Sequence, residues 1–361
     1  MRTLLFFIFI FFHCLSFSQR KKTSLDNDWK FAFGHANDPV KDFNYSIATI
    51  FAKTGAAQGT AIDPAFNDSA WRKLSLPHDW AVALPFVYSK SFDEQSHGYK
   101  PVGGAYPETS IGWYRKKFNV ARSDSGQRFQ IQFDGIYRDA ACWINGFYLG
   151  NNKSGYVGAS YDITHYLRYG QENTLVVRVD ATQYEGWFYE GAGIYRHVWL
   201  NQYNPVHLDE HPAFVYTRVQ NNTATVFIET SVLNESYAQA TVAVSAIITD
   251  RDGKKIGETN ATAVSLAVNE TRTVKQSVKL SNPKLWSLED PYLYRVIPVV
   301  RSGGTIIDSD KQRFGIRTID IKPNGVFLNG QYIKLKGTNN HQDHAGVGSA
   351  LPDYLQYYRI F

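Results

Sequence analysis

Six consecutive residues close to the carboxyl end of the chain combine side chains that bind ligands. Residues 339–344 hold two Asn, two His, one Gln and one Asp. They follow Gly337 and a short stretch, Ile333–Lys336, whose pattern predicts a strand. A polar run at the carboxyl end of a strand is typical of a ligand site, because the sheet below holds such a loop rigidly. The spacing therefore predicts a binding loop at this point of the chain.

A second group of candidate residues lies in the segment Glu185–Gly193, where aromatic rings alternate with carboxylates and glycines. Aromatic faces beside hydrogen-bonding groups suit sugars, whose C–H faces stack on rings while their hydroxyls take hydrogen bonds. Trp187 and Glu190 are the candidate ligand contacts of this segment. Packing of these aromatics within loops is the alternative, and the sequence leaves it open.

The elements that must position these loops begin with a first β-sandwich, predicted for residues 24–203. Short apolar or alternating runs are separated by turn residues, and no helical period persists for a dozen residues. Asn145-Gly146 between two apolar runs is the strongest hairpin signal, since both turn positions need positive φ. An all-β sandwich of jelly-roll type is expected. Its predicted strands are Trp113–Val120, Arg128–Phe133, Ala141–Ile144, Thr174–Val179 and Ile194–Leu200.

Residues 204–320 show a shift of composition toward Val, Thr, Ala and Ser. Strand-like runs at this spacing over about a hundred residues fit an immunoglobulin-like sandwich without its disulfide. Trp286 is interpreted as a packing residue, and the domain is expected to set its neighbours in place without chemistry of its own. The predicted strands are Thr225–Thr230, Thr241–Thr249, Arg272–Leu280 and Leu293–Val300.

Composition narrows the class of protein. The net charge is +5 with both signs interspersed, so no basic block points to nucleic acid. Arg2 followed by the apolar run Leu4–Phe12 and by small residues before Gln19 predicts a signal peptide over residues 1–18. We therefore expect a secreted or periplasmic protein with no membrane span after cleavage. Its remaining cysteine, Cys142, has apolar neighbours that favour an inert buried thiol.

The first sandwich contains five motifs: Leu76–Trp80, Gly112–Arg115, Phe133–Arg138, Trp143–Gly146 and Gly191–Arg196. In order and spacing they resemble the N-terminal sugar-binding domain of glycoside hydrolase family 2. This family contains β-galactosidases, β-glucuronidases and β-mannosidases. Phe314–Asp320 and Leu285–Tyr294 likewise resemble markers of the family's second domain. Residues 321–361 resemble the start of its catalytic (β/α)8 barrel, with Ile333–Lys336 as first strand and a helix from about Asp353.

The resemblance implies a retaining mechanism with two carboxylates about 5–5.5 Å apart. In the family both are Glu residues on later barrel strands, so we expect them beyond Phe361 and assign no catalytic residue. Asn234-Glu235 and Asn269-Glu270 fall in the second sandwich and are interpreted as turn residues. The sequence is thus expected to be the N-terminal part of a longer enzyme.

The loop Gly337–His344 is similar to the family's Gly-Val-Asn-Arg-His-Glu-X-His segment, with Asn340 where Arg is common and Asp343 at the variable position. The resemblance implies that His341 or His344 donates to sugar hydroxyls in the −1 subsite. Mutual orientation of His and Asp side chains is an alternative. Metal binding by His341 and His344 is a third, with no further ligands visible in the sequence.

The function expected from these features is terminal β-glycoside cleavage of the β-galactosidase type. The alternative is a non-catalytic carbohydrate-binding protein made of two β-sandwiches. No cofactor is implied, while a divalent or monovalent metal in a full-length enzyme stays open. The expected partner is a carbohydrate substrate and not nucleic acid, and homo-oligomerisation is left open.

Overall fold

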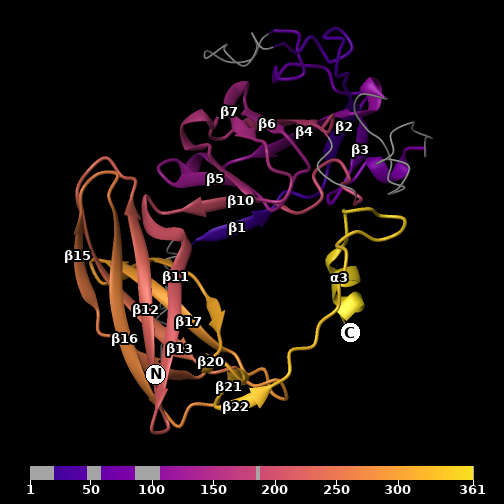
Figure 1. The fold of residues 1–361 in the computed structure, drawn as a ribbon. Coiled ribbons are helices and arrows are strands. Elements are labelled where there is room, and N and C mark those ends of the chain that lie inside the picture. The colour runs from indigo at the N-terminus through magenta and orange to yellow at the C-terminus, as the bar shows by residue number, and fades with distance from the viewer. Residues whose placement is uncertain (1–19, 47–57, 86–105, 184–187, 361) are drawn as a thin grey trace, which may run out of the picture. The chain divides into compact units, whose positions relative to one another are not determined.

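A computed structural model describes residues 20–46, 58–85, 106–183 and 188–360 (Figure 1). The described chain divides into two compact units. One contains residues 21–202 together with 336–361, and the other contains Arg20 with residues 203–335. The signal peptide predicted for residues 1–18 lies outside the described residues.

Two antiparallel sheets build residues 21–202. A six-stranded sheet has the order β3-β2-β4-β9-β6-β7, and a four-stranded sheet has the order β1-β10-β5-β8. This arrangement confirms the predicted β-sandwich of the first unit. The strands are β1 (Lys21–Ser24), β2 (Trp29–Phe33), β3 (Arg72–Leu74), β4 (Ile111–Asn119), β5 (Arg128–Phe133), β6 (Ala140–Ile144), β7 (Phe147–Asn152), β8 (Ala159–Asp162), β9 (Glu172–Asp180) and β10 (Val198–Tyr203). Short 3-10 turns lie at Ala81–Ala83, Pro107–Thr109, Arg122–Asp124 and Thr164–Tyr166.

The six-stranded sheet is covered on both faces, so β4 is buried almost throughout, including its Arg115 and Lys116. One face contributes to the main core through residues such as Tyr114 and Val177. The other carries Trp113 and Trp143, stacked with ring centroids 6.0 Å apart. Described residues between β2 and β3 cover that second face. Among them, Asp42 accepts a 2.7 Å hydrogen bond from Trp113 Nε1.

The predicted hairpin at Asn145-Gly146 joins β6 to β7, and both residues have positive φ, 50° and 88°. Cys142, on β6, is fully buried, and burial raises the pKa of its thiol to about 12. The predicted burial of this thiol is confirmed, and a thiol with this pKa stays protonated at neutral pH.

Residues 203–335 form a second sandwich, which agrees with the immunoglobulin-like prediction. A three-stranded sheet β11-β12-β16 faces a sheet with the order β14-β13-β17-β18, to which β15 and β19 add by pairing with β13 and β17 (Figure 1). The strands are β11 (Val206–Gln220), β12 (Thr223–Asn234), β13 (Ala240–Thr249), β14 (Lys255–Glu258), β15 (Thr262–Leu266), β16 (Thr271–Ser281), β17 (Tyr294–Ser302), β18 (Thr305–Ser309) and β19 (Gln312–Phe314).

Trp286 ties the end of this sandwich to the segment that follows it. Its backbone N–H donates to Ile316 O at 2.8 Å, and its carbonyl accepts from Asn329 Nδ2 at 3.0 Å. A Cβ on Gly315 would lie 3.1 Å from the Trp286 side chain, so the residue packs tightly, as predicted.

The carboxyl part of the chain begins with a small antiparallel sheet of β20 (Ile319–Lys322), β21 (Gly325–Leu328) and β22 (Gln331–Ile333). The strand predicted for Ile333–Lys336 is wrong: β22 ends at Ile333, and Lys334–Lys336 have no regular structure. No strand among the described residues pairs with them, and an extended segment needs a ladder partner. The expected helix is present as α3 (Asp353–Ile360). The barrel predicted from residue 321 onward stays a prediction.

Candidate functional site

Three segments of the first sandwich meet at one place and provide the base of the site. His78 N–H donates to Ile194 O at 2.8 Å, and Trp80 N–H donates to Ala192 O at 3.0 Å. Tyr137 and Gly193 exchange two backbone hydrogen bonds of 2.9 and 2.7 Å. Three of the motifs singled out in the sequence are therefore joined through their backbones.

Glycine is required at position 193. Its φ is +126°, and a Cβ there would lie 2.5 Å from the Tyr114 hydroxyl and 2.6 Å from the His78 carbonyl oxygen. Both distances are shorter than real Cβ contacts, so a side chain would separate the joined segments.

Asp79 lies at the centre of this junction, and its side chain is 5% exposed. One carboxylate oxygen accepts from the N–H groups of Ala81 and Ala192, both at 3.0 Å. The other accepts from Ser349 N–H at 2.8 Å and from the Tyr189 hydroxyl at 2.9 Å. Burial raises the pKa of Asp79, while the four donors act in the opposite direction. The bond from Ser349 connects the first sandwich to the segment directly after the predicted binding loop.

Half-buried His78 adds a polar contact beside Asp79. Its Nε2 faces Arg72 at 2.6 Å and its Nδ1 faces the Tyr114 hydroxyl at 2.7 Å. Because a guanidinium only donates, Nε2 is the acceptor and Nδ1 carries the proton. Burial, together with the charge of Arg72, lowers the pKa of His78 to about 4, so the ring is neutral at pH 7.

The end of the binding loop is a tight turn. The backbone groups of His344 and Gly348 exchange hydrogen bonds of 3.0 and 2.9 Å. Gly348 has a φ of +60°, and a Cβ there would lie 2.3 Å from Asp79 Oδ2 and 2.6 Å from the Tyr189 hydroxyl. The turn thus approaches Asp79 closely enough to exclude any side chain at this position.

The middle of the loop is held from the other direction by Arg359 of α3. Its guanidinium donates to the side-chain oxygen of Asn340 and to the carbonyl oxygens of His341 and Gln342. The first turn of α3 is attached through Asp353, which lies 3.2 Å from His197 Nε2.

A pocket of about 580 Å³ lies between this loop and the aromatic segment after the undescribed residues 184–187. Tyr156 contributes an exposed ring next to Phe188, with centroids 6.3 Å apart. Aromatic faces on one wall and amide and imidazole groups on the other suit a hydroxyl-rich ligand of sugar size. The lining residues are Tyr156, Phe188, Tyr189, Thr338, Asn339, Asn340, His341 and Gln342.

The structure brings only some of the six predicted ligand residues to this pocket. Asn340 and His341 line it, and His341 Nδ1 lies 3.7 Å from Asp343 Oδ1. Glu190 is buried, with 6% exposure, and does not line it. Trp187 lies outside the described residues.

His344 is exposed and does not line the pocket. Its Nδ1 lies 2.9 Å from the Ala345 carbonyl oxygen, so Nδ1 must donate. In the neutral ring this leaves Nε2 as an acceptor for a ligand hydroxyl, rather than the donor implied by the resemblance.

Asp79, Tyr189 and Arg359 are the residues that sequence reasoning did not single out. Asp79 stands within the motif Leu76–Trp80, one of the five that resemble the family's sugar-binding domain. A carboxylate beside buried aromatics is the only local signal, and its partner Ser349 is 270 positions away.

Two further observations concern metals and membranes. Within the described ranges, no group of three or more His, Cys, Asp or Glu side chains could hold a metal ion. In the same part of the chain, none of the helices has the length and apolar character needed to cross a membrane.

Each of the two units contains a region that matches a known protein-family model. Residues 22–204 match the sugar binding domain of the glycosyl hydrolases family 2, and residues 206–317 match the family's following domain. The chain belongs to glycosyl hydrolase family 2.

Individual members of the family are similar over most of this chain. A β-galactosidase of Bacteroides ovatus is 34% identical over 92% of the chain and 36% of its own length. A β-glucuronidase of Formosa agariphila is 29% identical over 87% of the chain and 34% of its own length. A family 2 member from Bacteroides cellulosilyticus has a solved structure that superposes with a TM-score of 0.78 at 30% identity, covering 94% of this chain and 41% of that one. The chain spans about a third of the length of these curated relatives.

Proposed function

We propose that this chain supplies the substrate-recognising N-terminal part of an exported glycoside hydrolase that cleaves terminal β-glycosides. The observation that carries the proposal is the pocket between the loop Thr338–Gln342 and the rings of Tyr156, Phe188 and Tyr189. It combines ring faces for the C–H surface of a sugar with amides and an imidazole for its hydroxyls.

The described side chains fit a binding role. Asn340 offers amide groups at the pocket, but Arg359 already occupies its side-chain oxygen, so its amide nitrogen is the group left for a ligand. His341 is exposed, with its Nδ1 directed toward Asp343, which leaves Nε2 for the ligand. Hydrolysis needs in addition a pair of carboxylates on either side of the glycosidic bond, one acting as acid/base and one as nucleophile. We propose that other residues of the barrel provide that pair.

A β-galactoside is the proposed substrate. The loop is more similar to the β-galactosidase pattern than to the β-glucuronidase pattern, and the Bacteroides ovatus relative is named a β-galactosidase. Asn340 at a position where Arg is common in the family removes a cation from the loop. A neutral sugar suits such a loop better than a carboxylated one.

The experiment uses the protein expressed from the complete open reading frame that encodes this chain. Chromogenic β-galactoside, β-glucuronide and β-mannoside are compared by kcat/KM, and we expect the β-galactoside to exceed the other two. His341→Ala should lower kcat/KM for the β-galactoside by at least about tenfold, since it removes a hydrogen bond to the ligand. Arg128→Gln is the control: Arg128 pairs with Asp162 and does not line the pocket, so kcat/KM should be unchanged.

Two outcomes would contradict the proposal. Turnover that is equal in wild type and His341→Ala would remove the loop from the substrate site. Saturable binding of galactosides with no turnover of any of the three substrates would favour the non-catalytic carbohydrate-binding protein. Export is tested separately: the amino terminus of the mature protein should begin at Gln19, and an intact Met1 would contradict the predicted cleavage.

A further inference from the structure

The second sandwich contains a pocket of its own, about 520 Å³ in volume. It lies between β11, the edge strand of the three-stranded sheet, and the segment that runs from β19 to the start of β20. Pockets of this size commonly hold small ligands. The lining residues are Val215, Tyr216, Thr217, Leu293, Gln312, Arg313, Phe314, Gly315, Arg317 and Ile319.

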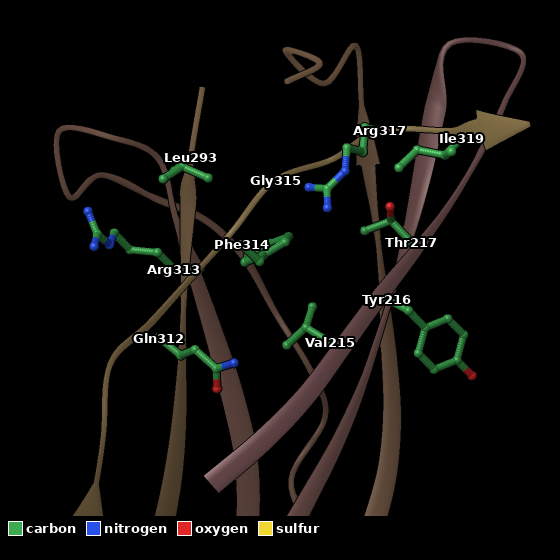
Figure 2. A pocket seen from close by; sticks show the side chains of 10 residues that line it. All are labelled: Val215, Tyr216, Thr217, Leu293, Gln312, Arg313, Phe314, Gly315, Arg317 and Ile319. Carbon is green, nitrogen blue, oxygen red and sulfur yellow. The ribbon is translucent and has the colours of Figure 1, made fainter. Parts of the chain in front are cut away.

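Figure 2 shows which of these side chains face one another. The guanidinium of Arg317 points toward the ring of Phe314, and Val215 and Thr217 project toward the same space from β11. Arg313 and Tyr216 point away from this space on opposite sides, so they belong to its rim. The pocket therefore has an apolar floor with one cation aimed over it.

The charge of the lining is one-sided, because it includes two Arg and no Asp or Glu. In the described part of this unit, arginine ion pairs are formed by Arg20, Arg251 and Arg272, and neither Arg313 nor Arg317 is among them. A guanidinium without a carboxylate partner is available to bind an anion from outside.

Arg317 is also held in place before any ligand arrives. Its guanidinium carbon lies 5.3 Å from the ring centroid of Trp286, and the Trp286 backbone is bonded to Ile316. A stacked guanidinium keeps its planar fork free for two parallel hydrogen bonds to a carboxylate or sulfate group.

We propose that this pocket is a second carbohydrate site, distinct from the pocket at His341, and that it binds an acidic saccharide such as a uronate-containing chain. Arg317 takes the carboxylate, Phe314 and Val215 contact the C–H face of the sugar ring, and Thr217 and Gln312 supply hydrogen bonds to hydroxyls. The choice of a saccharide over other anions rests on the proposed function. The choice of an anion rests on the lining alone.

The test measures binding by calorimetry to the 361-residue chain, without any need for hydrolysis. The probes are tri-galacturonate, the neutral trisaccharide galactotriose, sodium sulfate and an acidic hexapeptide. We expect tri-galacturonate to bind, and Arg317→Gln to weaken it by about tenfold or more, which is the effect of removing a charge-assisted hydrogen-bonded pair.

The matched control is Arg218→Gln. Arg218 also stacks on an aromatic ring, at 5.5 Å from the centroid of Phe227, but it does not line the pocket. It should leave the affinity for tri-galacturonate unchanged, and His341→Ala should do the same.

The other outcomes overturn the inference. Equal affinity of wild type and Arg317→Gln would remove Arg317 from the site. Equal binding of galactotriose would deny the role of charge, and binding of sulfate or the acidic peptide alone would deny the saccharide. Loss of tri-galacturonate binding in His341→Ala would assign the ligand to the other pocket. Failure of the hydrolysis assay, in contrast, would leave the affinity of this pocket for tri-galacturonate unaffected.

Discussion

Replacing Asp79 by Ala removes the acceptor of four hydrogen bonds in a single step. Three of the donors are backbone N–H groups, of Ala81, Ala192 and Ser349, and the fourth is the Tyr189 hydroxyl. A hydrogen bond to a charged group contributes about 1.5–3 kcal/mol, and a buried donor left without a partner costs about 1–3 kcal/mol. Removing the carboxylate also removes its own cost of burial, so the terms partly cancel. We expect Asp79→Ala to lower the free energy of unfolding by about 3–4 kcal/mol.

Asp79→Asn distinguishes the roles of the two carboxylate oxygens, because it keeps one oxygen and replaces the other by an NH2 group. The amide oxygen can still accept from Ala81 and Ala192, while the amide NH2 would face the N–H of Ser349. The Tyr189 hydroxyl can turn and accept instead, but the Ser349 N–H cannot. The expected loss is about 1–2 kcal/mol, concentrated at the binding loop.

The assay is urea unfolding followed by tryptophan fluorescence. Seven of the eight Trp residues lie in residues 21–202, so the signal reports mainly on the unit that contains Asp79. Amide hydrogen exchange at Ser349 is the local measurement, and both variants should accelerate it. Glu172→Gln is the control, because its ion pair with Lys117 is about half exposed and should contribute about 1 kcal/mol or less.

If Asp79→Ala lowers the free energy of unfolding by less than about 1 kcal/mol while amide exchange at Ser349 stays at the wild-type rate, the prediction is refuted. That result would mean that the four bonds do not hold the loop in solution. A large loss of stability with unchanged exchange at Ser349 would instead confine the role of Asp79 to the joined segments of the sandwich.

Two further predictions concern groups near this centre. Burial depresses the pKa of His78 from 6.5 to about 4, so the folded state favours the neutral ring and its stability should fall as the pH drops from 6.5 through 4. The free energy of unfolding obtained from urea denaturation should decline across this range by about 2–3 kcal/mol in wild type and much less in His78→Gln, and parallel pH dependences would contradict the assignment. Arg359→Gln removes bonds to Asn340, His341 and Gln342, all at exposed positions, and should cost about 1 kcal/mol or less. It should raise amide exchange in residues 338–343 by up to about fivefold, while exchange in the first sandwich stays constant.

The strands could be predicted from the sequence because their signals are local. Alternating polar and apolar residues located β5 without error, and the Asn-Gly pair placed the turn of the β6–β7 hairpin correctly. The prediction for Ile194–Leu200 began four residues before β10, which starts at Val198. Ile194 has no regular secondary structure, and its carbonyl accepts from His78 N–H outside the ladder of β10, a difference that periodicity alone does not reveal.

The site was predicted less completely, because its geometry depends on contacts between residues that are far apart in the sequence. A polar run was enough to identify Asn340 and His341 as pocket residues. Composition could not show that Glu190 is buried or that Arg359 would fold back on the loop. Both depend on contacts between segments that no local pattern describes.

Two glycines show how far the position of the loop is determined by the sandwich. A Cβ on Gly191 would lie 2.6 Å from Asp79 Oδ2, and one on Gly348 would lie 2.3 Å from the same atom. Both glycines also have positive φ, so a side chain at either position would be strained as well as crowded. Asp79 Oδ2, which accepts the hydrogen bond from Ser349 N–H, is therefore closely packed both by the sandwich and by the loop. Since the Tyr189 hydroxyl bonded to that oxygen belongs to a pocket residue, a substitution at Gly191 should change ligand affinity even though Gly191 does not line the pocket.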